Sequence, residues 1–180
     1  MLIGFVGSPC SGKTTTAAAL FSELKNAGEP VEFFPEYARE YIMRMRFSNG
    51  SRDLSKNDQL QIYWKQKEIE NMYQTMSPNS LTITDGSTLN SYFYGLEEKL
   101  ELEEELERYD LIFFCRGLKH TVSDDNRVHD LDFSKKLDIS MAQKIVSLPP
   151  YISKKVHTLW GTKEQRLQTA MEFLNNHENK

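Results

Sequence analysis

Two alternating patterns of apolar residues run along the chain, one typical of strands and the other of helices. Residues 2–7 form a short apolar run that ends in glycine, and on the helix that follows one face carries Ala17, Leu20, Phe21 and Leu24. Further runs of strand length lie at 31–36, 81–86, 110–115 and 155–160, with predicted helices between them. This alternation predicts an α/β fold with a five-stranded parallel sheet flanked by helices.

Capping and breaking residues place the ends of the predicted helices. Gly28 and Pro30 end the first helix, and Ser55 is a suitable N-cap for a long helix to about residue 76. Thr162 with Gln165 makes a capping box for the last helix. The other helices are predicted at about 37–47, at about 96–108 and in a segment that ends near 148, before two prolines. The charged stretch 119–136 has no apolar period, so we expect a mobile loop or lid there.

Composition places the chain among ordinary globular proteins. It has 180 residues, of which 39% are hydrophobic, and a net charge of -4, which fits one domain over residues 1–180. No apolar span is long enough for a membrane helix, and the first residues do not resemble a secretion signal. We therefore expect a cytoplasmic protein without a membrane partner. Cys10 and Cys115 have neither the number nor the spacing of a disulfide framework or a metal site.

The acidic charge is concentrated in one segment. Residues 97–108 contain seven Glu against Lys99 and Arg108, which leaves the rest of the chain close to neutral. We expect these acids to form the solvated face of a helix rather than a metal-binding cluster. The net charge therefore argues only weakly against a nucleic-acid partner.

The strongest chemical signal is the segment from Gly7 to Thr14, GSPCSGKT, which fits the phosphate-binding pattern GxxxxGK[ST] between a strand and a helix. Amides at a helix N-terminus bind anions, Lys13 would neutralise the β and γ phosphates of a nucleotide, and the Thr14 hydroxyl would bind Mg²⁺. We therefore expect ATP and Mg²⁺ as cofactors. The predicted nucleotide-binding residues are Gly7, Pro9, Cys10, Ser11, Gly12, Lys13, Thr14 and Thr15. The competing interpretation is a glycine-rich turn without a ligand.

Phosphoryl transfer also needs acids and cations beside the phosphates, and ligands of open α/β sheets bind at the carboxyl ends of the strands. Glu36 ends the second predicted strand and Asp85 the third. Asp85 is a candidate for holding Mg²⁺, directly or through an intervening group, and Glu36 for accepting a proton from a substrate hydroxyl. Arg116 follows the fourth strand and Arg127 lies in the predicted lid, where either could hold the charge of a transferred phosphoryl group. Polar residues are also common at strand ends, and Arg127 equally fits a solvated loop charge.

Six blocks of sequence together resemble the NadR-type ribosylnicotinamide kinase family. Besides the phosphate loop they are PEYAREY at 35–41, TDGSTLNSYFYG at 84–95, YDLIFFC at 109–115, DDNRVHD at 124–130 and WGTKEQRLQTA at 160–170. The resemblance covers nearly the whole chain in order. It implies a P-loop fold like that of nucleoside monophosphate kinases, with a lid at about 119–136. The implied activity is transfer of the ATP γ-phosphate to the ribose 5′-hydroxyl of nicotinamide riboside.

The resemblance also implies roles for individual residues. Asp85 would lie near the metal and the substrate hydroxyl, and Arg127 would be the lid arginine. The residues that would line the acceptor pocket are Glu36, Tyr37, Arg39, Asp85 and Tyr92. Gly161 and Thr162 would lie near adenine, by analogy with related P-loop kinases. Asn126 replaces a glycine in the lid block, and Gly86 replaces the threonine that usually follows the acid, which we expect to open space for a different or larger acceptor.

Three functions remain open at this stage. The first is a kinase for a small nucleoside, with nicotinamide riboside preferred. The second is a kinase for a nucleic-acid hydroxyl, such as a hydroxymethylated pyrimidine in DNA, because cations that could grip a phosphate backbone lie at Arg44, Arg46, Arg52 and Lys56. Those cations fit the exposed face of a helix and turn as well. The third is a nucleotide-binding switch. The sequence is also compatible with a homo-oligomer.

Overall fold

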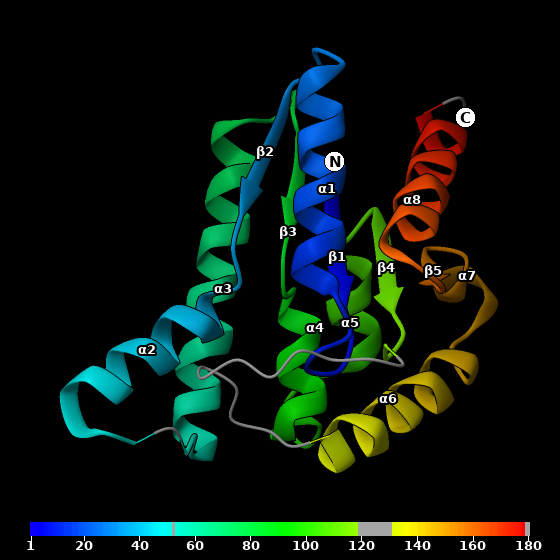
Figure 1. The fold of residues 1–180 in the computed structure, drawn as a ribbon. Helices are drawn as coiled ribbons and strands as arrows, with labels where there is room; N and C mark the ends of the chain where they lie inside the picture. The colour runs from blue at the N-terminus through cyan, green and yellow to red at the C-terminus, as the bar shows by residue number, and fades with distance from the viewer. Residues whose placement is uncertain (52, 119–130, 179–180) are drawn as a thin grey trace.

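The centre of the molecule is a parallel β-sheet (Figure 1). The computed structural model describes residues 1–51, 53–118 and 131–178. The strands are β1 (Leu2–Val6), β2 (Val31–Phe34), β3 (Leu81–Thr84), β4 (Leu111–Cys115) and β5 (Val156–Leu159). Their order is β2-β3-β1-β4-β5, and every pair is parallel, which confirms the predicted sheet. Because the chain continues first to one side of β1 and later to the other, the carboxyl end of β1 is a switch point where ligands of such sheets bind.

Helices cover both faces of the sheet. They are α1 (Lys13–Asn26), α2 (Tyr37–Asn49), α3 (Lys56–Met76), α4 (Thr88–Ser91), the π-helical turn η1 (Tyr92–Leu96), α5 (Leu102–Glu107), α6 (Leu131–Val146), α7 (Pro150–Ser153) and α8 (Lys163–Glu178). Ile3 and Phe5 of β1 face a core shared with α1 and α8, whereas Leu2 and Val6 face a second core shared with α4 to α7. This alternation follows from the period of two in a strand, and it explains why all five residues of β1 and of β4 are buried.

The predicted helix starts are confirmed by their hydrogen bonds. The Ser55 hydroxyl accepts from the Asp58 amide at 3.2 Å, and the Asp58 carboxylate accepts from the Ser55 amide at 2.8 Å. At α8 the Gln165 side chain accepts from the Thr162 amide at 2.9 Å, and the Thr162 hydroxyl accepts from the Gln165 amide. These reciprocal caps satisfy amides that a helix leaves without partners in its first turn.

The glutamate-rich segment differs from the single helix predicted at 96–108. Gly95 adopts φ 102°, the turn at residues 97–101 follows η1, and α5 begins only at Leu102. The expectation of a fully solvated acidic face is also wrong for Glu105, which is only 4% exposed. Its carboxylate accepts hydrogen bonds from Tyr63 at 2.5 Å and from Thr88 at 2.7 Å. A buried acid can therefore be hidden in a run that looks uniformly solvent-exposed.

Two other boundaries differ from the prediction. Residues 131–136 of the expected lid form the start of α6, whose buried face of Ser134, Leu137 and Met141 has the spacing of a helix; residues 119–130 lie outside the described part of the chain. The prolines after residue 148 do not simply end a helix, because Pro150 begins the short helix α7. Of the helices in the described ranges, none is long and apolar enough to span a membrane.

Candidate functional site

The loop between β1 and α1 crosses the carboxyl edge of the sheet at the switch point. A β-carbon on Gly7 would lie 2.5 Å from the backbone oxygen of Cys115, so the close approach of β1 and β4 admits only glycine there. Gly12 has φ 84° and directly precedes Lys13, the first residue of α1. Lys13 is 7% exposed and its Nζ donates to the carbonyl oxygens of Gly7 at 2.9 Å and Ser8 at 3.1 Å. The loop thus has the geometry that cradles phosphate at a helix N-terminus.

Glu36 and Asp85 leave neighbouring strands at the same edge. Phe34 of β2 pairs with Thr84 of β3, and the Asp85 amide donates to the Phe34 carbonyl at 3.1 Å. Burial raises the pKa of the Glu36 carboxyl above its ordinary value, with a smaller contribution from Asp85, while Lys13 opposes the rise. Burial likewise raises the pKa of Asp85, although a hydrogen bond with Thr14 lowers it. Both acids are therefore more basic than exposed carboxylates.

Gly86 determines where the Glu36 side chain lies. It has φ 81°, and a β-carbon built on it would be 2.5 Å from Cγ and 2.7 Å from Cδ of Glu36. The expectation that Gly86 opens space for a larger acceptor is therefore wrong, because the Glu36 side chain occupies that space. The glycine instead allows the carboxylate to lie beside the acid that ends β3.

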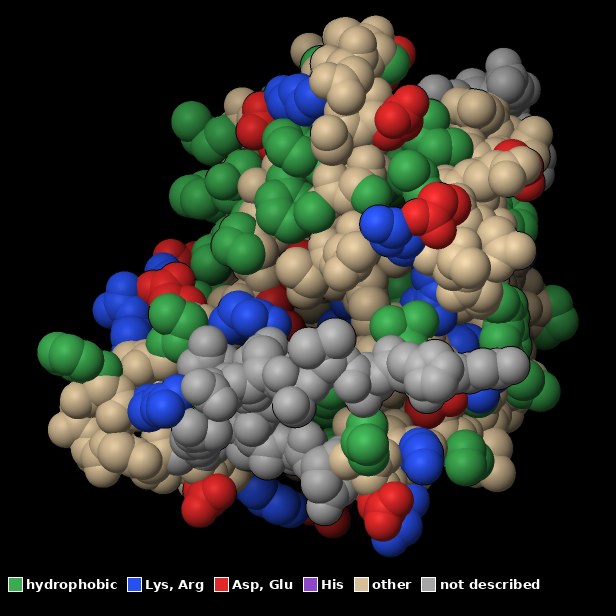
Figure 2. All heavy atoms as spheres, viewed as in Figure 1, with side chains coloured by type: hydrophobic (Ala, Val, Ile, Leu, Met, Phe, Trp, Pro, Cys, Tyr) green, Lys and Arg blue, Asp and Glu red, His purple; other side chains and the backbone are tan. Residues whose placement is uncertain are grey.

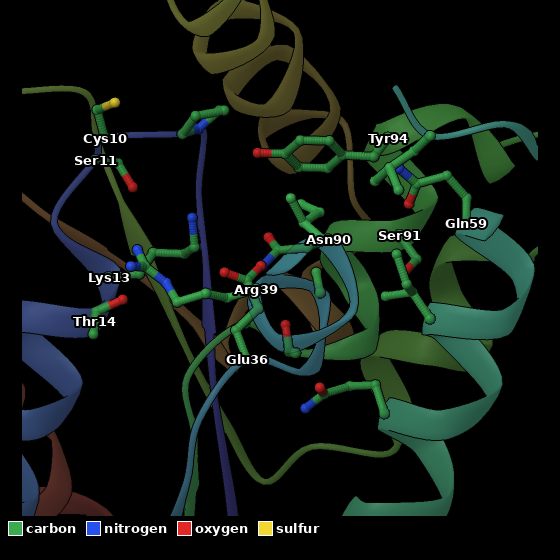
Figure 3. A pocket seen from close by; sticks show the side chains of 18 of the residues that line it. Cys10, Ser11, Lys13, Thr14, Glu36, Arg39, Gln59, Asn90, Ser91 and Tyr94 are labelled. Atoms are coloured by element: carbon green, nitrogen blue, oxygen red, sulfur yellow. The ribbon is translucent and has the colours of Figure 1, made fainter. Parts of the chain in front are cut away.

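A cavity of about 340 Å³ lies between the phosphate loop and Glu36 (Figure 3). Its lining includes the loop from Pro9 to Thr15, together with Glu36 and Arg39. Asp85 is not in the lining and is only 2% exposed. The structure thus brings the predicted phosphate loop and two of the predicted acceptor residues around one space, with Asp85 buried next to Glu36 and Thr14.

Tyr37 and Tyr92 do not line this cavity. The Tyr37 ring packs edge-on against Tyr41, and Tyr92 is buried against Phe93. Tyr94 takes the place expected of Tyr92, because the non-helical backbone of η1 at Tyr94 and Gly95 changes which side chain faces the cavity. In Figure 3 the Tyr94 ring lies across the cavity from Glu36.

Asn90 on α4 is a site residue that the sequence analysis missed. Its Oδ1 accepts from the Gly7 amide at 3.3 Å, which directs Nδ2 away from that amide. Within the described ranges, the buried side-chain atoms that have no hydrogen-bond partner are Ser11 Oγ, Asp85 Oδ1 and Asn90 Nδ2. Most buried polar groups in proteins are paired, so three unpaired atoms around one loop mark a place built for a polar ligand. The polar spacing of Ser87, Asn90 and Ser91 on a buried helix was the available signal.

Gln66 on α3 links the start of α2 to the end of β3, next to the two acids. Its Oε1 accepts from the Tyr37 amide at 3.0 Å and its Nε2 donates to the Thr84 hydroxyl at 2.9 Å. Gln66 therefore holds the first residue of α2 against the last residue of β3, and so fixes the chain on either side of Glu36 and Asp85.

The remaining predicted site residues lie apart from the cavity or outside the described chain. The Arg116 guanidinium pairs with Asp138 at 2.8 Å and lies 4.5 Å from the centre of the Trp160 ring, and Arg116 is not among the residues that line the cavity. Gly161 and Thr162 lie where β5 ends and α8 begins. Arg127 is outside the described residues.

The donor set for a cation is small but suitable for Mg²⁺. No cluster of three or more His, Cys, Asp or Glu side chains with metal-binding geometry occurs in the part of the chain that the structure describes. Mg²⁺ in nucleotide sites is typically bound by one or two protein oxygens, with phosphate and water as its other ligands. The Thr14 hydroxyl beside the unpaired Asp85 Oδ1 fits that requirement.

A parallel sheet of this order, with a glycine-rich loop running into a buried lysine at the start of α1, defines the P-loop nucleotide-binding class. Within that class, the family described as an AAA domain matches residues 2–166, and the chain belongs to this family. A search of curated proteins found no match.

Solved structures with the same fold include NadR and thymidylate kinases. NadR in complex with NR superposes with a TM-score of 0.72 at 18% identity, covering 99% of this chain and 52% of that one. The present chain thus spans about half the length of NadR. Thymidylate kinase from Candida albicans has a TM-score of 0.71 at 18% identity, covering 99% and 92% of the two chains. Thymidylate kinase from Ehrlichia chaffeensis has 0.63 at 15%, covering 97% and 98%. These similarities establish the fold.

Proposed function

We propose that this protein is a kinase that transfers the γ-phosphoryl group of MgATP to a nucleoside hydroxyl, with the 5′-hydroxyl of nicotinamide riboside as the first candidate. The observation that carries the proposal is the Glu36 carboxylate, which lines the same cavity as the P-loop and is more basic than an exposed glutamate. A base in that place has a clear use in activating a hydroxyl.

On the donor side, the P-loop amides and Lys13 would hold the phosphates of ATP. Lys13 is already placed by the Gly7 and Ser8 carbonyls, so its charge lies inside the loop at little entropic cost. Thr14 and Asp85 would hold Mg²⁺, which when bound would neutralise charge on the phosphate oxygens. NadR, a structural neighbour, is described in complex with NAD and AMP-PNP, which supports an adenine nucleotide as donor.

On the acceptor side, Glu36 would take the proton of the hydroxyl as its oxygen bonds to the γ-phosphorus and the bond to the leaving ADP oxygen breaks. The proton ends on the Glu36 carboxylate, and the raised pKa makes this acceptance more favourable. Arg39 lines the cavity and lowers the pKa of both acids, so it would keep them ionised enough to act.

The charge around the acceptor space favours a hydroxyl over a phosphate as the acceptor. Glu36 lines the cavity with Asp85 buried beside it, and their carboxylates would repel the dianionic phosphate of a nucleoside monophosphate, against the attraction of Lys13 and Arg39 in the same lining. A hydroxyl brings no such charge, and the positively charged ring of nicotinamide riboside would be attracted to the acids. The resemblance of the sequence to ribosylnicotinamide kinases supports the same choice.

The nucleic-acid alternative keeps one supporting observation. Helix α2 has no buried residue and extends away from the sheet (Figure 1). Phe47 on it is 96% exposed. Lys and Arg side chains lie on the same side of the molecule in Figure 2. Exposed aromatic and basic side chains together can hold a single strand. Arg44 pairs with Glu40 at 2.6 Å and Lys56 with Glu98 at 3.3 Å, which reduces the charge offered to a backbone; Arg52 lies outside the described residues.

One transfer screen distinguishes these functions. The protein is incubated with γ-labelled ATP and, separately, with nicotinamide riboside, common nucleosides, thymidine monophosphate and DNA containing hydroxymethylated pyrimidine. We expect label on nicotinamide riboside. Label only on the monophosphate or only on DNA would overturn the nucleoside assignment. Nucleotide binding without transfer to any acceptor would favour a switch.

A further inference from the structure

Arg166, in the first turn of α8, binds three separate parts of the backbone. The residue is 2% exposed. Its Nη1 donates to the carbonyl of Ser11 at 2.5 Å, its Nη2 to that of Arg116 at 2.8 Å, and its Nε to that of Gly161 at 3.2 Å. In the described part of the chain its hydrogen-bond partners are thus all backbone oxygens.

The three carbonyls belong to loops that follow three different strands. Ser11 is in the phosphate loop after β1, Arg116 directly follows β4, and Gly161 follows β5. Ser11 and Gly161 are 150 residues apart in sequence and have no direct hydrogen bond to each other in the described structure. Arg166 is therefore a bridge between the phosphate loop and the loop after β5.

Arg166 itself is held by a well-packed helix. Its amide donates to the Thr162 carbonyl at 3.0 Å, within the turn that the Thr162 and Gln165 caps fix. Further along α8, Ala170 and Leu174 are buried in the core that α1 shares. The guanidinium thus projects from a helix that is held in place, so movement of one loop relative to the other would break its hydrogen bonds.

Only arginine suits this position. A guanidinium offers donors in a planar fork that can reach three acceptors at once, whereas a lysine ammonium is a single point on a flexible stem. A buried cation also requires polar partners, and the three carbonyl dipoles supply them.

We propose that Arg166 is a positioning residue that holds the phosphate loop and the loop after β5 in one register, so that the triphosphate and the base of a nucleotide are bound as a unit. This inference rests on the proposed function in taking an adenine nucleotide as the ligand, and on the expectation that its base lies near Gly161 and Thr162, at the carboxyl edge of the sheet where ligands of such folds bind. If it is right, the link matters for a ligand that touches both loops and much less for one that touches the phosphate loop alone.

The test is equilibrium binding to the full chain and to Arg166→Met, without any acceptor. The ligands are Mg·AMP-PNP, which has both parts, and Mg·tripolyphosphate, which has only the phosphates. We expect AMP-PNP to bind about tenfold or more weakly to the variant, and tripolyphosphate to lose a clearly smaller factor. Arg166→Lys, which keeps the charge, should show the same difference between the two ligands in reduced form.

A matched control is Lys155→Met. Lys155 also donates to two backbone carbonyls, those of Glu107 and Tyr109, but it lies where β4 and β5 begin, at the opposite edge of the sheet. The Lys155→Met variant should leave the ratio of the affinities for Mg·AMP-PNP and Mg·tripolyphosphate unchanged. An Arg166 variant that stays folded by circular dichroism and binds both ligands as wild type does, or loses the same factor for both, would overturn the inference. Failure of the proposed transfer would look different, because the wild type would bind AMP-PNP yet phosphorylate no acceptor.

Discussion

The side chain of Glu36 packs directly over the α-carbon of Gly86, with no room between them for a methyl group. The two residues follow adjacent parallel strands, so this contact sets the position of the carboxylate at the edge where the phosphate loop lies. A base that acts on a hydroxyl must be within hydrogen-bond reach of it, and small displacements are costly. The identity of residue 86 should therefore control the activity of residue 36.

Replacing Gly86 with alanine should displace Glu36 and lower kcat by about tenfold or more, because the new methyl group occupies the space of the Glu36 Cγ. Binding of Mg·AMP-PNP should change little. The measurement is steady-state transfer with γ-labelled ATP, alongside AMP-PNP titration.

Gly28→Ala is the matched control for this variant. Gly28 has φ 84°, close to the 81° of Gly86, but a β-carbon there meets no atom within 4 Å. Both variants therefore carry a similar backbone penalty of about 1–2 kcal/mol, and only one disturbs Glu36. Equal kcat values for the two variants would show that the contact has no catalytic consequence.

Glu36→Gln should reduce kcat by about 10²- to 10⁴-fold, because the amide cannot accept the proton. The wild-type rate should fall as the pH is lowered through the raised pKa of Glu36, at a higher pH than for an exposed glutamate, and the variant should lose that acid limb. Glu32→Gln is the control, because Glu32 lies on β2, the strand that leads to Glu36. This variant should retain both the rate and its pH dependence. An identical acid limb in Glu36→Gln would remove Glu36 from the proton transfer.

Asp85→Asn should lower turnover far more than it lowers nucleotide affinity. The buried carboxylate lies beside Thr14, where it would hold Mg²⁺. Its charge would therefore act more on the phosphoryl group in the transition state of transfer than on the bound nucleotide. Raising the Mg²⁺ concentration should restore part of the lost rate. An unchanged rate at low Mg²⁺ would show that Asp85 has no role in metal or acceptor chemistry.

Glu70 should make stability depend on pH. It is fully buried beside Arg108 and Tyr109, and burial raises the pKa of its carboxyl to about 7, with Arg108 opposing the rise. The folded state therefore holds this proton more tightly than the unfolded chain does. Its contribution to stability is complete below the ordinary glutamate pKa and is lost as the pH rises through about 7.

Chemical denaturation between pH 5 and 8 checks this prediction. The free energy of unfolding of the wild type should fall over that range by an amount on the order of 1 kcal/mol or more, and Glu70→Gln should flatten the dependence. Glu68→Gln is the control, because Glu68 is an exposed acid on the same helix. If the free energy of unfolding of Glu70→Gln still fell with pH as in the wild type, the pH dependence would belong to another group.

The parts of this molecule that could be predicted from sequence are those set by local patterns. The P-loop, the five strands, the N-cap at Ser55 and the capping box at Thr162 each depend on residues within a few positions of one another. Glu36 and Asp85 could be placed on one edge because parallel strands end on the same side.

The parts that could not be predicted depend on contacts between distant segments. Asn90 binds an amide 83 residues away, and Arg166 binds a carbonyl 155 residues away. Both lie in sequence blocks that carry the family resemblance, but nothing local in those blocks indicates these contacts. Gly86 was misinterpreted for the same reason, since its effect comes from a side chain on another strand. Glu105 was misinterpreted because its hydrogen-bond partner Tyr63 lies on α3.

The central claim is that this site phosphorylates a nucleoside hydroxyl with Glu36 as base. The most direct measurement is the rate at which γ-label from ATP reaches nicotinamide riboside, compared between wild type, Lys13→Ala and Glu36→Gln. We predict steady transfer by the wild type, loss of transfer together with weakened AMP-PNP binding in Lys13→Ala, and loss of transfer with AMP-PNP binding retained in Glu36→Gln. Transfer at an undiminished rate by Glu36→Gln, or no transfer to any nucleoside by a wild type that binds AMP-PNP, would contradict the account.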